Sequence, residues 1–361
     1  MEKILFSGNE ALARGAYEAG VKVCSAYPGT PSTEIFESLP QYKDDLYCEW
    51  APNEKVATEV AYGASLAGVR SLCAMKHVGL NVAADPVFTA AYNGVGGGFV
   101  IVVADDPSMH SSQNEQDSRH HAIASKLPML EPGDSAECRD YAKLAFALSE
   151  QFDTPVLLRT CTRVAHSQSL VELFDREECP LSEYTKNPAK FVMTPGNAIP
   201  AHVRVEQRTE ALRQWNENSP ILKEEMGSGE WGIITSGISY QYVKEALPDA
   251  SVLKIGMVNP LPLERMAAFA KKVKKLAVVE ELDPIMEEQL RAMGIHVDLG
   301  KKELGLLGEY SQSRIRAAFG IANPENQKLE EPLPVRPPVL CPGCPHRGLF
   351  HVLHKLKVRV S

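Results

Sequence analysis

The feature that most constrains the fold is the run Phe-Val-Ile-Val-Val-Ala at residues 99–104, which Asp105 and Asp106 follow directly. An uninterrupted apolar run of this length is typical of a strand buried on both faces, as the central strand of a parallel sheet is. Similar segments alternate with helical patterns on both sides of it: strands at 21–27, 71–76 and 155–160, and helices at 53–66 and 136–152. This alternation predicts an α/β fold, with a mainly parallel sheet and helices on both faces.

A second, smaller strand–helix series follows an interruption. Residues 166–228 are largely polar and predict a linker or an excursion over a neighbour, with one helix near 203–216. Five prolines make residues 316–340 a stiff linker. The expected organisation is a first α/β domain at 1–165, the linker at 166–228, a second α/β domain at 229–315, the proline-rich linker at 316–340, and the start of an incomplete domain at 341–361.

Charge and composition exclude several classes of partner. A formal net charge of -8 argues against nucleic-acid binding, which requires clustered Lys and Arg. No apolar run approaches the roughly 20 residues that cross a bilayer, so a cytoplasmic protein without membrane association is expected. Six of the eight cysteines are scattered and fit buried thiols, whereas Cys341 and Cys344 have the spacing of metal ligands. Such a pair alone is found in zinc sites, in iron–sulfur sites and by chance.

Polar or glycine-rich loops are expected after three of the predicted strands, at residues 28–33, 77–81 and 105–121. In a parallel sheet the carboxyl ends of the strands meet at one edge, and ligands bind there. Glu54 lies near the same edge, at the start of the helix predicted at 53–66. From position alone, the simpler interpretation is structural: the carboxylate stabilises the positive end of the helix, and Asn53 caps it.

Longer motifs change that interpretation. Residues 27–33 (Tyr-Pro-Gly-Thr-Pro-Ser-Thr) resemble the loop that opens the pyrimidine-binding domain of thiamine-diphosphate-dependent 2-oxoacid:ferredoxin oxidoreductases. Residues 49–55 (Glu-Trp-Ala-Pro-Asn-Glu-Lys) are similar to the catalytic-glutamate element of that family. Residues 75–81, 105–117 and 341–348 resemble the alpha subunits of its indolepyruvate branch. The resemblance extends over the whole chain, and it implies a pyrimidine-binding domain followed by a transketolase-C-like domain.

The resemblance implies that Glu54 is catalytic. In this family a buried carboxylate hydrogen-bonds the pyrimidine ring nitrogen of thiamine diphosphate, and burial raises the pKa of the carboxyl. Glu59, five residues later, is expected to be an ordinary surface carboxylate. The same resemblance places Gly29, Thr30, His77 and Asn81 around the substrate or cofactor.

One departure concerns the substrate's carboxylate. The pyruvate enzymes have a substrate-binding arginine after the central strand, where this chain has Asp105-Asp106-Pro107. Asp105, Asp106 and His110 are expected at the site, and His110, Arg119 and His121 are the candidates for holding the carboxylate.

The implied reaction is oxidative decarboxylation of an arylpyruvate such as indolepyruvate, with CoA as acyl acceptor and ferredoxin as electron acceptor. The implied partners are a beta subunit and further copies of the chain, with thiamine diphosphate, Mg²⁺ and [4Fe-4S] clusters in the complete enzyme. A cluster needs four thiolates, and no cysteine follows Cys344. We therefore expect this chain alone to bind no cluster and to be inactive. Two alternatives stay open: a different 2-oxoacid, or a non-catalytic assembly module that keeps the fold.

Overall fold

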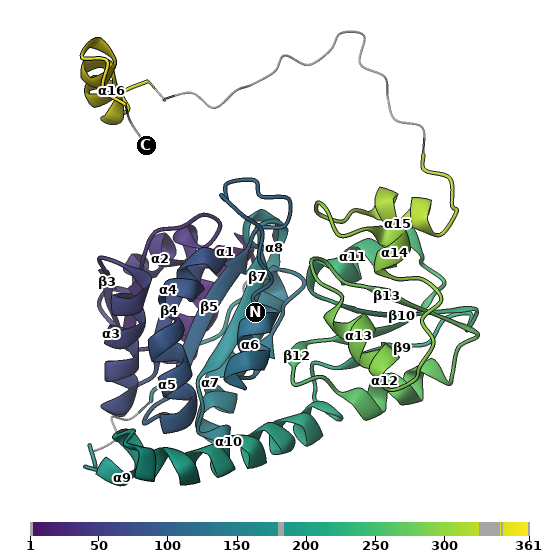
Figure 1. Cartoon of the computed structure of the whole chain (residues 1–361), viewed down its shortest axis with the longest axis horizontal. Helices are drawn as coiled ribbons and strands as arrows, with labels where there is room; N and C mark the ends of the chain where they lie inside the picture. Colours follow the sequence, from purple (N-terminus) through teal and green to yellow (C-terminus); the bar gives the residue numbers. More distant parts are fainter. Residues whose placement is uncertain (1–2, 180–183, 325–339, 341, 360–361) are drawn as a thin grey trace. The chain divides into compact units, whose positions relative to one another are not determined.

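The computed structural model describes residues 3–179, 184–324, 340 and 342–359. The chain forms two compact units, Met1–Ala322 and Asn323–Ser361. The first unit contains a seven-stranded sheet and a four-stranded sheet, each with helices packed on it (Figure 1). Across the described ranges, no helix is long and apolar enough to cross a membrane.

The first sheet has the strand order β12-β6-β7-β5-β4-β2-β3. Its strands are β2 (Val23–Ala26), β3 (Tyr47–Trp50), β4 (Ser71–Lys76), β5 (Phe99–Asp105), β6 (Met129–Leu130), β7 (Val156–Cys161) and β12 (Met257–Asn259). All pairs are parallel except β12 with β6. The predicted parallel sheet is confirmed, with β5 between β4 and β7.

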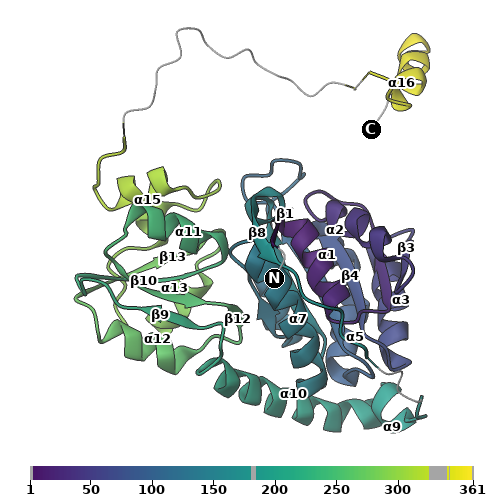
Figure 2. The same cartoon turned by 180° about the vertical axis from the view of Figure 1, so that it is seen from behind.

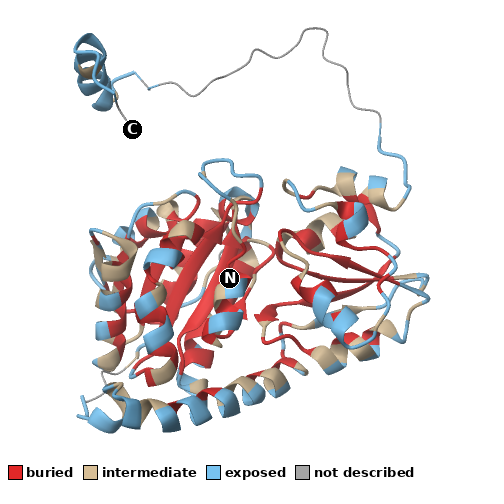
Figure 3. Ribbon diagram, in the orientation of Figure 1, coloured by how far each residue is buried: buried red, intermediate tan, exposed pale blue. Residues whose placement is uncertain are grey.

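Helices cover both faces of this sheet, so every residue of β5 is buried (Figure 3). Val100 and Val102 belong to a core shared with α1 (Gly8–Glu18) and α7 (Ser135–Phe152), which lie in front of the sheet in Figure 2. Ile101 and Val103 belong to the opposite core, shared with α3 (Glu54–Leu66) and α5 (Ala84–Asn93). Side chains that alternate along one strand thus bind the two helical layers to the sheet.

The second sheet has the order β13-β10-β11-β9, with only β9 antiparallel. Its elements are β9 (Lys223–Glu225), β10 (Trp231–Ser236), α11 (Gly237–Ala246), β11 (Ser251–Ile255), α12 (Leu263–Ala270), β13 (Lys275–Val279) and α13 (Ile285–Ala292). The second α/β layer is therefore present as predicted. Strand β12, which follows β11 in the chain, pairs with β6 at the edge of the first sheet. Ile234 of β10 also belongs to the same apolar core as Ile101. The proposed domain boundaries stay a prediction.

The expected linker at 166–228 contains regular structure of its own. Strand β8 (Gln168–Glu172) pairs antiparallel with β1 (Lys3–Ser7). Helix α10 (Pro195–Asn216) begins earlier than the helix expected there, and it runs along the base of the first unit in Figure 1. The segment thus connects the first sheet to the second, and α10 packs on α5 of the first sheet's helical layer.

Short helices complete the described fold. They are α2 (Thr33–Ser38), the 3-10 helix η1 (Leu39–Tyr42), α4 (His77–Val82), α6 (Arg119–Ser125), α8 (Thr162–His166), α9 (Pro188–Phe191), α14 (Lys301–Leu304), α15 (Gln312–Ala318) and, in the second unit, α16 (His346–Lys355). The expected loop at 77–81 is wrong, because α4 begins at the residue after β4. Gly79 lies inside this helix and is buried. Because it has no Cβ atom, α4 can approach α3 closely at this position.

Candidate active site

The candidate site lies at the carboxyl ends of four neighbouring strands. Strands β3, β2, β4 and β5 are adjacent and parallel, so the segments that follow them meet at one edge of the sheet. Those segments are the loop after β2, α3, α4 and the loop 106–118. This is the edge where α/β sheets bind ligands, and it is the edge that the sequence predicts.

Glu54 is the first residue of α3 and is half-buried. The Asn53 side chain accepts a hydrogen bond from the Val56 amide at 3.0 Å, so Asn53 caps the helix as expected. The Glu54 carbonyl accepts from the Thr58 hydroxyl at 2.9 Å. Its carboxylate, however, forms no hydrogen bond or ion pair with any described residue. The cap therefore fixes the backbone and leaves the carboxylate available to a ligand.

Gly79 forms the wall opposite this carboxylate. A Cβ atom at Gly79 would lie 2.6 Å from both Cγ and Oε1 of Glu54 and 2.8 Å from Cδ. Real carbon contacts are longer, about 3.5–4.0 Å. Only glycine at this turn of α4 permits the observed position of the Glu54 side chain, so α4 determines where the carboxylate lies.

His77, the first residue of α4, is completely buried. Its Nε2 lies 3.2 Å from the Asn114 carbonyl, which requires Nε2 to carry the proton. Its Nδ1 is then a buried acceptor, and no described residue donates to it. Asn81 lies on α4 but is exposed. Of the two α4 residues proposed from sequence, only His77 is buried and has a polar atom without a hydrogen-bond partner among the described residues.

Asp105 and Asp106 organise the loop 106–118. Asp105 accepts from the Ser118 hydroxyl at 2.5 Å and from Arg159 Nε at 2.7 Å. Asp106 accepts from the Ser112 hydroxyl at 2.5 Å and from the Thr162 hydroxyl at 2.6 Å.

Burial acts to raise the pKa of Asp106, but hydrogen bonds from Ser112, Thr162 and the Ser111 amide together hold it below its ordinary value. Both carboxylates are therefore engaged within the chain rather than open to a ligand.

The same loop contacts the other strand ends. The Ser111 hydroxyl donates to the Thr30 carbonyl at 3.3 Å, which places Thr30 and its neighbour Gly29 beside the loop. Lys76 Nζ donates to the Ser111 carbonyl at 2.9 Å. His110, in contrast, is exposed, and its Nε2 lies 3.2 Å from Glu309 Oε2. The structure thus brings Gly29, Thr30, Glu54 and His77 to one edge, with Ser111 linking two of the strands.

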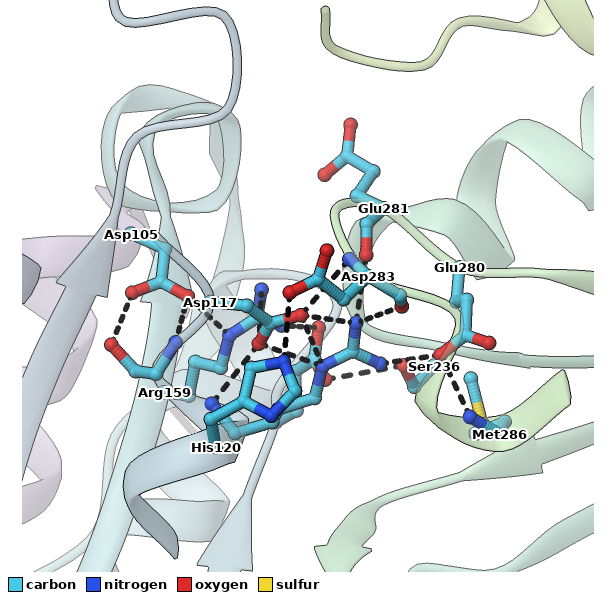
Figure 4. Close-up of polar contacts among 12 residues, drawn as sticks. Asp105, Asp117, His120, Arg159, Ser236, Glu280, Glu281, Asp283 and Met286 are labelled. Carbon is cyan, nitrogen blue, oxygen red and sulfur yellow. Dashed lines mark hydrogen bonds and ion pairs between the residues drawn. The ribbon is translucent and has the colours of Figure 1, made fainter. Parts of the chain in front are cut away.

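Arg119, a candidate for the substrate's carboxylate, is fully engaged elsewhere. Its Nη1 donates to Glu280 at 2.6 Å, its Nη2 to Asp117 at 2.6 Å, and Nη2 also bonds the carbonyls of Glu281 and Asp283. Figure 4 shows Asp117 facing Glu280 and Asp283 across the junction of the two sheets. Through these bonds Arg119 joins the two halves of the first unit. Because its side chain is also only 1% exposed, it is not free to bind substrate.

His121, the remaining candidate, is half-buried, and burial lowers its pKa despite the opposing effect of Asp105. The structure adds two residues that the sequence interpretation missed, Lys76 and Gly79. A lysine ending the otherwise uncharged strand 71–76 was a visible signal for the first. Nothing in the sequence distinguished Gly79 from a loop glycine.

The proposed metal ligands are only partly described. Cys344 in the second unit is half-buried, with Sγ 3.5 Å from His346 Nδ1. Cys341 lies outside the described residues. Within the part of the chain that the structure describes, no group of three or more His, Cys, Asp or Glu side chains is arranged to hold a metal ion.

The structure resembles a solved oxidoreductase and a solved transketolase in fold. A 2-oxoglutarate:ferredoxin oxidoreductase from Magnetococcus marinus, solved with 2-oxoglutarate, coenzyme A and succinyl-CoA bound, superposes with a TM-score of 0.73. It covers 88% of this chain and 65% of that chain at 18% identity. A split-gene transketolase gives a TM-score of 0.53 at 16% identity, covering 87% of this chain and 97% of that chain. At these identities the likeness establishes the fold alone.

Sequence comparison identifies much more similar proteins. The chain is 44% identical over 381 residues to the indolepyruvate oxidoreductase subunit IorA of Archaeoglobus fulgidus, covering 98% of this chain and 61% of that protein. The IorA subunit of Pyrococcus abyssi is 40% identical over 386 residues, covering 98% of this chain and 59% of that protein. The chain thus spans about 60% of the length of these curated relatives.

The family assignment follows from a match over more than half of the chain. Residues 14–224 match the family described as "Pyruvate flavodoxin/ferredoxin oxidoreductase, thiamine diP-bdg". The match includes all four strand ends that form the candidate site. The chain therefore belongs to the thiamine-diphosphate-binding family of pyruvate flavodoxin/ferredoxin oxidoreductases.

Proposed function

We propose that this chain supplies the pyrimidine-binding half of the thiamine diphosphate site in a 2-oxoacid:ferredoxin oxidoreductase. The proposed reaction is oxidative decarboxylation of an arylpyruvate, indolepyruvate above all, to the acyl-CoA, with reduction of ferredoxin. The proposed partners are a beta subunit, CoA and ferredoxin. Support for the substrate class comes from relatives named indolepyruvate oxidoreductase subunits that are 40–44% identical to the chain.

The observation that carries the proposal is the Glu54 carboxylate. It is half-buried and held at a helix start, yet no described residue bonds it. Its oxygens are therefore open to a ligand bound at this edge of the sheet. Gly79 leaves room for the Glu54 side chain against α4, and the buried His77 Nδ1 has no hydrogen-bond donor among the described residues. These residues fit the heterocyclic, nitrogen-rich half of thiamine diphosphate.

Each residue has a defined task in this proposal. Glu54 would hold a proton between its carboxylate and the pyrimidine ring nitrogen, the acid–base role that a positioned carboxylate can perform. His77 offers a hydrogen-bond acceptor at Nδ1. The loop 106–118, held by Asp105 and Asp106, contacts His77 through the Asn114 carbonyl and Thr30 through the Ser111 hydroxyl. Bound thiamine diphosphate supplies the carbon nucleophile and the electron sink for decarboxylation.

An anaerobic assay of the assembled enzyme tests the proposal. The full-length protein and its partner subunit are incubated with thiamine diphosphate, Mg²⁺, CoA and ferredoxin, and ferredoxin reduction is followed. The panel contains indolepyruvate, phenylpyruvate, pyruvate and 2-oxoglutarate. We expect CoA-dependent reduction with the two arylpyruvates at the highest kcat/KM. Reduction with 2-oxoglutarate or pyruvate alone would contradict the substrate class, and no reduction with any 2-oxoacid would contradict the function.

A further inference from the structure

Lys76 is a buried lysine whose ammonium group bonds only uncharged atoms of the described residues. It ends β4 and is 7% exposed. Its Nζ donates to the Ser111 carbonyl at 2.9 Å and lies 3.5 Å from the Ser111 hydroxyl, both of which are uncharged. No acidic side chain of the described residues forms an ion pair with it. Lys254, at 1% exposed, shows the usual arrangement, since its Nζ lies 2.5 Å from the Glu137 carboxylate.

Asp106 does not fill that role. Asp106 acts on Lys76 electrostatically, but its oxygens accept hydrogen bonds from Ser111, Ser112 and Thr162. Burial lowers the pKa of Lys76, and Asp106 only partly opposes this effect. A buried ammonium ion without an ion-pair partner is unfavourable, so an anionic ligand would stabilise this side chain.

Lys76 also lies on the same wall as the proposed cofactor site. A Cβ atom at Gly29 would be 3.1 Å from Lys76 Cβ, so the lysine stem lies along the loop that follows β2. Ser111 bonds both Lys76 and the Thr30 carbonyl. The helix that begins directly after Lys76 carries Gly79, which adjoins Glu54, and His77, which contacts the loop 106–118.

The other nearby cations are already paired. Arg159 bonds Asp105 at 2.7 Å and Glu131 at 2.6 Å, and Arg163 is paired with Glu309. Arg119 is enclosed by Asp117 and Glu280. His110 lies against Glu309. Among the described residues around this edge, Lys76 alone combines burial, a positive charge and the absence of an acidic partner.

We propose that Lys76 binds the C1 carboxylate of the 2-oxoacid substrate. The assignment rests on the proposed function, because it places the substrate beside the Glu54 site. This assignment gives the carboxylate a partner on β4, the neighbour of β5. After β5 itself, the sequence has no arginine in the position expected from the pyruvate enzymes. Ser111 orients the ammonium through its carbonyl, and at least one of the three ammonium donors is left for substrate.

Two unreactive probes test this assignment. The probes are 3-phenylpropionate and its neutral amide, which have the same shape and differ in charge. Their affinities for the assembled enzyme with thiamine diphosphate are measured by calorimetry. We expect the wild type to bind the acid more tightly than the amide. Lys76→Met should lower affinity for the acid by roughly 10- to 100-fold, the range for a hydrogen bond to a charged group, and should leave affinity for the amide unchanged.

Control variants separate this role from a structural one. Lys76→Arg keeps the charge and should retain part of the preference for the acid. Lys274→Met removes an exposed lysine before β13 that is paired with Glu230 at 3.0 Å, and it should change neither affinity. If Lys76→Met does not fold, Lys76→Gln, which keeps a donor to Ser111, replaces it.

The outcomes distinguish the two proposals. An unchanged preference for the acid in Lys76→Met or Lys76→Gln would overturn the assignment of Lys76 and leave the proposed function standing. A wild-type enzyme that binds neither probe and oxidises no arylpyruvate would overturn the proposed function, and the assignment with it.

Discussion

Replacing Gly79 with alanine tests whether α4 positions the Glu54 carboxylate. The new Cβ would lie 2.6 Å from Cγ and Oε1 of Glu54. Because carbon atoms in contact are separated by about 3.5–4.0 Å, the carboxylate must move by about 1 Å. A displacement of this size at a reacting group lowers turnover by about 100-fold. Gly79→Ala should therefore reduce kcat for arylpyruvate-dependent ferredoxin reduction by about two orders of magnitude.

The free energy of unfolding should change much less than the rate. Alanine in place of glycine favours a helix by about 1 kcal/mol, whereas an extra methyl group in a packed site costs about 1–3 kcal/mol. The net destabilisation is then at most about 2 kcal/mol, which urea unfolding measures.

Gly63→Ala is the matched control, because Gly63 lies on the same helix as Glu54 and a Cβ there would meet no atom within 4 Å. It should keep full activity. Full activity of Gly79→Ala, or an equal loss in Gly63→Ala, would show that α4 does not position the Glu54 carboxylate.

The junction between the two sheets gives two predictions about stability. Arg119→Met removes the cation that bridges the buried Asp117 and Glu280 and should lower the unfolding free energy by about 3–5 kcal/mol, which urea unfolding reports; a change below about 1 kcal/mol would contradict the role of this ion-pair cluster. Burial raises the pKa of Glu281 from its ordinary 4.5 to about 7, although the Tyr310 amide bonds it at 2.7 Å. The folded protein therefore holds a proton between pH 4.5 and 7 that the unfolded chain releases, and stability falls as pH rises through this window. Glu281→Gln should be more stable than the wild type at pH 8, by up to about 3 kcal/mol, and the difference should vanish near pH 4; identical pH dependence in the two proteins would contradict it.

Local sequence patterns predicted the sheet and the start of α3 well. The run at 99–104 predicted a strand covered on both faces, and the structure packs its alternate residues into two separate cores. Asn53 predicted the start of α3 because N-capping is a local interaction within four residues. Both features depend on residues close together in the chain.

Features that depend on distant contacts were missed. The loop expected at 77–81 is a helix without a capping side chain, and Gly79 within it suggested a turn. The role of Gly79 becomes visible only when α3 is packed against it. Arg119 was a plausible substrate ligand until Glu280, 161 residues away, proved to enclose it. The pairing of β12 with β6 and of β1 with β8 likewise joins segments that no local pattern connects.

The central claim is that the Glu54 carboxylate performs proton transfer at the cofactor. The most direct test is the turnover of Glu54→Gln in the assembled enzyme, compared with Glu59→Gln, an exposed glutamate on the same helix. Glu54→Gln should fold normally, since the carboxylate bonds no described residue, and its kcat should fall by roughly 100- to 10,000-fold, as loss of an acid–base group does. Glu59→Gln should have wild-type kcat. Near-normal turnover in a folded Glu54→Gln enzyme would contradict the claim.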